Sequence, residues 1–156
     1  MELKFKVSGR VARPVEEVFE AVADPAKLSA YFTTGGAVGR MQTGATVQWE
    51  FADFPGAFPV EIVEVEKNRR ILLQWEANEG PPEEGDPVVR AAYMTTVVFT
   101  FEPLDDGRTL VTIEEGGWRE TQTGLKAAFG NCQGWAQMLA ALKVWVEHGI
   151  NLREGF

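Results

Sequence analysis

The sequence predicts an α+β fold in which a curved antiparallel sheet of about six strands wraps around one long C-terminal helix, with two short helices after the first strand. Segments of strand-like alternation, joined by tight turns, follow one another through the middle of the chain. A helical hydrophobic pattern then runs from about residue 125 to residue 148. The 156 residues show no internal repeat and no break in composition, so we expect a single domain over residues 1–156.

The first third of the chain predicts one strand and two short helices. Residues 3–11, LKFKVSGRV, alternate well enough for a strand. Pro14 and two following glutamates favour a helix start, because proline suits the first helical turn and acids suit the positive end of the helix dipole. Asp24 ends this helix and can cap a second one that runs from Pro25 to about Tyr31. Residues 33–44 are rich in glycine and predict a flexible loop.

Five further strands are predicted before the closing helix. Their alternation places aromatic and aliphatic side chains on one face and polar side chains on the other. Lys67-Asn68 joins two strands tightly, and Asp105-Asp106-Gly107 is a strong hairpin signal. Residues 78–87, rich in proline, glycine and acids, predict a surface loop. The expected strands are 46–52, 58–67, 69–77, 91–103 and 108–116.

The closing helix holds the only cysteine, Cys132, and the only histidine, His148. At 100° per residue Cys132 faces the sheet and His148 faces away, and the two lie sixteen residues apart, or about 24 Å along a straight helix. A nucleophile and its base need to be about 3 Å apart, so this pair is not a catalytic dyad. One cysteine and one histidine also argue against a conventional zinc site, and no metal is expected. The stripe expected to face the sheet is Ala128, Cys132, Trp135, Leu139, Leu142, Val146 and Ile150.

Charge and hydropathy exclude several classes of function. A net charge of −8 repels phosphate backbones and anionic membranes. No apolar run is long enough to span a bilayer, and the N-terminus lacks the apolar core of a signal peptide. We therefore expect a cytoplasmic protein that binds no nucleic acid, does not insert into membranes and carries no cofactor.

A single helix over the apolar face of a curved sheet leaves room for a small apolar ligand. Aromatic side chains supply apolar area and stacking surfaces, which suit a flat or ring-bearing molecule. The alternative is that the same side chains simply fill the core. The expected lining residues are Trp49, Phe51, Trp75, Tyr93, Val97, Phe99, Ile113, Glu115, Trp118, Phe129, Cys132, Trp135 and Leu139.

Glu115 is the one carboxylate that the alternation places on the inner face, because it shares that face with Val111 and Ile113. Such a group could orient a polar part of the ligand or act as a general base. The alternative is a rim residue bonded to a neighbouring backbone or arginine. An enzyme of the cyclase, hydrolase or isomerase type, with Tyr93 or Thr95 beside Glu115, is thus a second hypothesis for the function.

Four blocks of the sequence resemble START-like domains of the SRPBCC superfamily. More narrowly, they are similar to the group named after the C-terminal domain of the activator of heat-shock protein 90 ATPase. Residues 13–33 resemble the opening of that group, 60–76 its central strand pair, 107–117 a later strand, and 134–149 its closing helix. The matching positions of the first block are Pro14, Val18, Phe19, Ala21, Asp24, Pro25, Leu28, Tyr31 and Phe32.

This resemblance implies a helix-grip fold, a curved sheet that grips a long helix with a cavity between them. Members of the superfamily bind lipids, hormones or other apolar molecules, and some cyclise polyketides. A third hypothesis is an interaction protein that associates with the chaperone. The activator itself carries a further N-terminal domain that engages the chaperone, and the start of this chain at its first strand argues against that role.

The sequence departs from the pattern of this group at two places. Tyr31 stands where the group has tryptophan, and the loop 78–87, which is expected to border the cavity mouth, is acidic. A homodimer is compatible with the sequence.

Overall fold

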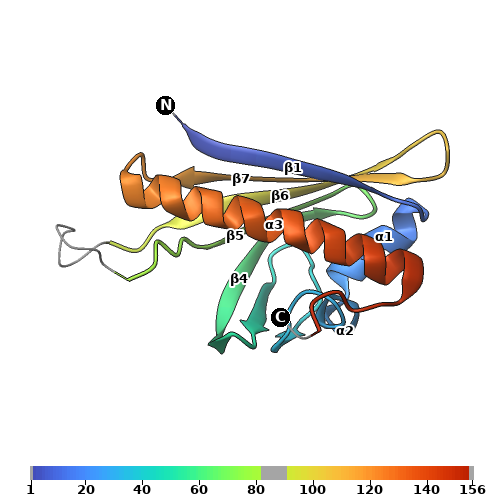
Figure 1. The fold of residues 1–156 in the computed structure, drawn as a ribbon, viewed down its shortest axis with the longest axis horizontal. Coiled ribbons are helices and arrows are strands. Elements are labelled where there is room, and N and C mark those ends of the chain that lie inside the picture. The colour runs from blue at the N-terminus through green and yellow to red at the C-terminus, as the bar shows by residue number, and fades with distance from the viewer. Residues whose placement is uncertain (1, 82–90, 155–156) are drawn as a thin grey trace.

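One antiparallel sheet and one long helix dominate the fold (Figure 1). The computed structural model describes residues 2–81 and 91–154, and within them the sheet has seven strands in the spatial order β1-β7-β6-β5-β4-β3-β2. The helices are α1 (Val15–Ala23), α2 (Pro25–Ser29) and α3 (Gln122–His148). The strands are β1 (Leu3–Val11), β2 (Gly36–Val38), β3 (Thr46–Phe51), β4 (Phe54–Glu66), β5 (Arg70–Glu76), β6 (Met94–Pro103) and β7 (Thr109–Trp118).

The predicted helix-grip architecture is confirmed, with seven strands in place of about six. The additional strand is β2, which lies in the glycine-rich stretch predicted as a loop and pairs with β3. Its glycines permit close approach: a Cβ at Gly35 would lie 2.7 Å from Cγ of Glu50, and Gly36 adopts a φ of +110°. Glycine here allows a strand to form against β3, which the composition alone could not distinguish from a flexible connection.

Two helix boundaries differ from the prediction. α3 begins at Gln122 because the Thr121 side chain accepts a hydrogen bond from the backbone N–H of Gly124, at 3.1 Å. α2 ends at Ser29, two residues before the predicted end at Tyr31. At the other end of α3, Gly149 adopts the left-handed conformation expected of a C-cap, with a φ of 69°.

α3 covers only part of the sheet, packing chiefly on β1 and β7, while α1 lies near its C-terminal end (Figure 1). The buried face of α3 includes Met138 and Ala141, which lie outside the stripe predicted to face the sheet. Cys132 is only partly buried, and Ile150 is 58% exposed because it follows the end of the helix. The half of the sheet formed by β3, β4 and β5 is therefore left largely free of α3.

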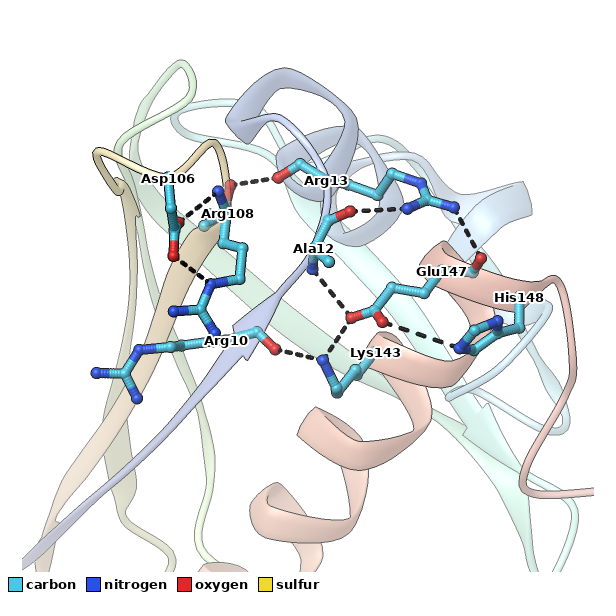
Figure 2. Close-up of polar contacts among 9 residues, drawn as sticks. Arg10, Ala12, Arg13, Asp106, Arg108, Lys143, Glu147 and His148 are labelled. Carbon is cyan, nitrogen blue, oxygen red and sulfur yellow. Dashed lines mark hydrogen bonds and ion pairs between the residues drawn. The ribbon is translucent and has the colours of Figure 1, made fainter.

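The last turns of α3 are tied to the end of β1 by polar contacts (Figure 2). The Glu147 carboxylate accepts hydrogen bonds from the Lys143 ammonium, at 2.5 Å, and from the backbone N–H of Ala12, at 2.9 Å. Arg13 donates to the backbone carbonyl of Glu147, at 2.8 Å. His148, which was expected at the surface, has a side chain that is 64% exposed and lies 3.9 Å from the Glu147 carboxylate.

Glu147→Gln is expected to lower the stability at neutral pH by about 1 kcal/mol. The hydrogen bond from Lys143, together with that from Ala12, lowers the pKa of the Glu147 carboxyl. A lowered pKa contributes stability above the unfolded value of about 4.3, and this contribution is lost as the pH falls through the folded value. Urea unfolding between pH 3 and pH 7 should show a difference from the wild type that shrinks in acid. A difference of constant size would contradict this account, and Glu16→Gln, at an exposed position of α1, is the control.

Candidate ligand-binding pocket

A pocket of about 600 Å³ opens beside α3, over the half of the sheet that the helix leaves uncovered. This volume lies in the range typical of small-molecule sites, about 300–1,000 Å³. The sheet contributes residues of β3, β4 and β5, and α3 contributes Gly130, Asn131, Gly134, Trp135 and Gln137. Gly130 and Gly134 lie one turn apart, and a Cβ at either position would meet nothing within 4 Å. The two glycines therefore leave open space along the helix on this side.

Five aromatic residues that line the pocket contact one another in a closed circuit, which we call the aromatic belt: Phe32, Phe51, Phe58, Trp75 and Trp135. Each ring contacts the next. The centroid separations in that order are 5.1, 6.0, 5.9 and 5.4 Å, and Trp135 returns to Phe32 at 5.6 Å. These distances are typical of stacked and edge-to-face aromatic pairs. The belt joins the segment after α2 to β3, β4, β5 and α3, so it depends on the whole fold.

Glu115 lies directly behind the belt, on the inner face of β7 as the alternation predicts, and is 0% exposed. Its Oε1 accepts a hydrogen bond from the indole N–H of Trp135, at 2.8 Å. Its Oε2 accepts from the indole N–H of Trp75, at 2.8 Å, and from the Thr95 hydroxyl, at 2.6 Å. The amide of Asn131 donates to both oxygens, at 3.1 and 3.2 Å.

These bonds assign Glu115 a positioning role. A carboxylate offers about four lone-pair sites, and here all of them face protein donors. Because the N–H groups of Trp75 and Trp135 are directed at Glu115, the two rings are held in fixed orientations and offer their carbon faces to the pocket. The donors are two indoles, a hydroxyl and a side-chain amide, so within the described residues neither the backbone nor an arginine holds this group, contrary to the rim alternative.

The structure distributes the other predicted lining residues over several places. Phe51, Trp75 and Trp135 line the pocket. Trp49, Val97, Phe99 and Ile113 are buried in the core, where they support the belt from behind. Trp118 is buried against Phe5 at a stacking distance of 5.4 Å.

The remaining predicted residues lie away from the pocket. The Tyr93 hydroxyl donates to Glu79, at 2.8 Å, and the Arg119 guanidinium lies over the Tyr93 ring. Leu139 lines a second, smaller cavity of about 360 Å³ between β1 and α3. Phe129 is 68% exposed because it lies about 120° around the helix from Trp135. Cys132 is absent from the lining of both cavities.

Several residues that line the pocket were not predicted from the sequence. Phe58 shares the inner face of β4 with the buried Val60 and Ile62, so the alternation could have indicated it. The two glycines one turn apart in α3 were also a signal, since each costs a helix interior about 1 kcal/mol relative to alanine. Arg153 lies after the end of α3, where neither helical nor strand periodicity indicates which way a side chain points. Of the predicted mouth loop, Asn78 lines the pocket, and residues 82–87 lie outside the described residues.

The described residues contain no group of three or more histidine, cysteine, aspartate or glutamate side chains that could hold a metal ion. Over the same part of the chain, none of the helices has the length and apolar character needed to cross a membrane.

The helix-grip fold with a pocket beside the long helix defines a START-like domain of the SRPBCC superfamily. Residues 12–147 match the family described as "Activator of Hsp90 ATPase homolog 1-like protein", and the chain belongs to that family. No curated protein matches the chain.

Several solved structures are similar to this chain and have the same fold. Protein SSP2350 from Staphylococcus saprophyticus is 26% identical, with a TM-score of 0.76, and the match covers 97% of this chain and 96% of that one. DynU16, a protein in the dynemicin biosynthetic locus, is 24% identical with a TM-score of 0.74, and the match covers 94% of this chain and 48% of DynU16. The Aha1 dimer from Colwellia psychrerythraea is 21% identical with a TM-score of 0.70, and the match covers 94% and 98% of the two chains.

Proposed function

We propose that this protein binds a small apolar or aromatic molecule in the pocket between the sheet and α3. The observation that carries the proposal is the aromatic belt, five rings that each contact the next and that line a pocket of about 600 Å³. Rings held edge to face and stacked offer flat apolar surfaces, which suit a ligand that itself contains rings. Membership of a superfamily with ligand-binding members supports the same function.

The scaffold behind the belt supports binding as well. Glu115 fixes the orientation of Trp75 and Trp135 through their N–H groups, so the pocket walls are preorganised before a ligand arrives. A preorganised site loses less conformational entropy when the ligand binds, and this raises the affinity. A Cβ at Gly130 or Gly134 would meet no atom within 4 Å, which supports the view that protein side chains do not fill the pocket on this side.

Gly134→Leu is expected to weaken the binding of a neutral aromatic probe at least about tenfold, because the new side chain occupies the pocket. N-phenyl-1-naphthylamine, whose fluorescence rises in apolar surroundings, is a suitable probe. Gln133→Leu adds the same side chain at an exposed neighbouring position and is the matched control. The proposal fails if the wild type does not bind the probe, or if Gly134→Leu binds it as tightly as Gln133→Leu does.

The catalytic alternative rests on Glu115 as a general base, and the hydrogen bonds of that carboxylate weaken it. A base must offer a lone pair to the substrate within hydrogen-bond reach. Both oxygens of Glu115 already accept bonds from protein donors, and the residue is absent from the pocket lining.

The family takes its description from an activator of the Hsp90 ATPase, and Aha1 from Colwellia psychrerythraea forms a dimer. For this chain, the lack of chaperone binding and the cytoplasmic location stay predictions, and a homodimer is compatible with the sequence. Sedimentation of the purified protein, alone and mixed with the chaperone, tests its oligomeric state and its chaperone binding.

A further inference from the structure

Arg153 is the only basic side chain among the described residues that line the pocket. It follows α3, in a turn where its backbone N–H donates to the Asn151 side chain, at 3.0 Å. Its guanidinium carbon lies 5.7 Å from the centroid of the Phe32 ring and 5.8 Å from that of Phe51, within the range of cation–π contacts. The cation is thus placed against two members of the aromatic belt.

Among the described residues, the Arg153 guanidinium lacks the partner that such a group normally has. Its Nε is shielded from solvent and meets no hydrogen-bond acceptor in that part of the chain. Within residues 2–81 and 91–154, no carboxylate comes within the 4.0 Å ion-pair distance of Arg153, whereas Arg40 and Arg70 each hold one at 2.9 Å or less. A buried, unpaired donor of a charged group is costly, so this cation is suited to receive an acceptor from outside the chain.

The remaining charged side chains of the pocket lining are acidic. Asp53 and Glu76 are both exposed, so solvent and salt screen their repulsion of an anion. Arg153 is half-buried between rings, where water competes less and a contact with an anion is stronger. A guanidinium is planar and can donate two parallel hydrogen bonds to a carboxylate or sulfonate.

We propose that the pocket selects an amphiphilic anion, a flat aromatic or apolar body that rests on the belt and carries a carboxylate or sulfonate-like group that faces Arg153. This inference rests on the proposed function and names the class of its ligand. The indole N–H groups of Trp75 and Trp135 are already bonded to Glu115, which leaves Arg153 as the charged donor available to the acidic group.

Two probes with the same aromatic body test this proposal. 8-Anilino-1-naphthalene sulfonate carries a sulfonate, and N-phenyl-1-naphthylamine is its neutral counterpart. The wild type should bind the sulfonate about tenfold more tightly than the neutral probe. Arg153→Gln should reduce this preference to about twofold or less, because it weakens the binding of the sulfonate far more than that of the neutral probe. Arg153→Lys, which keeps the charge without the planar fork, should retain part of the preference.

Arg69→Gln is the matched control, because it removes one positive charge at a side chain that is 80% exposed and distant from the pocket lining. It should leave the affinities for both probes unchanged. If Arg153→Gln binds both probes as the wild type does, Arg153 merely anchors the end of the chain and the inference is overturned, while the proposed function stands. If the wild type binds neither probe, the proposed function and this inference fail together.

Discussion

Glu115→Leu is expected to lower the free energy of unfolding by about 3–5 kcal/mol. The substitution removes an acceptor that is 0% exposed and leaves the N–H groups of Trp75 and Trp135 without a partner. The Thr95 hydroxyl and the Asn131 amide lose the same acceptor. Unfolding in urea, followed by tryptophan fluorescence, measures this loss.

Glu114→Leu is the control, because Glu114 precedes Glu115 in β7 and points to the other face of the sheet, opposite Lys6 of β1. Its expected cost is below about 1 kcal/mol. Glu115→Gln should fall between the two, since one oxygen remains as an acceptor while the new amide brings donors toward other donors. Wild-type stability in Glu115→Leu would show that the indoles do not depend on this carboxylate.

Gly124→Ala is expected to cost about 1–3 kcal/mol, through overpacking at the start of α3. A Cβ at Gly124 would lie 1.9 Å from the carbonyl oxygen of Arg119, so either the helix start or the preceding turn must shift. The N–H of Gly124 also forms the bond to Thr121 that caps the helix. Thermal unfolding of the variant should show a lower midpoint than that of the wild type.

Gly130→Ala, in the same helix, is the matched control. An added methyl group there meets nothing within 4 Å, and alanine is the better helix former by about 1 kcal/mol. This variant should therefore be as stable as the wild type or more stable. Equal stability of the two alanine variants would contradict the steric account of Gly124.

The sheet and its long helix could be predicted because their signals are local. Alternation in β7 correctly placed Glu115 on the inner face, and Gly149 correctly marked the end of α3. The extra strand β2 escaped prediction since the same glycines fit a loop and a close strand pairing equally well.

The candidate site was less predictable, because its contacts depend on register and on segments far apart in the chain. The partners of Glu115 include Trp75, which is 40 residues away on β5, and Asn131, which is 16 residues away on α3. The register shift between Ile62 and Glu64 in the β4–β5 pairing also interrupts the alternation, so Val63 is 44% exposed although its neighbour Ile62 is buried. The carboxylate was identified correctly as an inner residue, but its role as an anchor for two indoles required the assembled fold.

The central claim is that a ligand occupies the pocket that the aromatic belt lines. Titration of ¹⁵N-labelled protein with N-phenyl-1-naphthylamine, followed by two-dimensional NMR, tests it most directly. We expect the amide signals of Gly130, Gly134 and Trp135 to shift along one saturating curve, while those of Gly9 and Ala140 at the second cavity stay in place. Shifts confined to the second cavity, or no shifts at saturating probe, would contradict the claim.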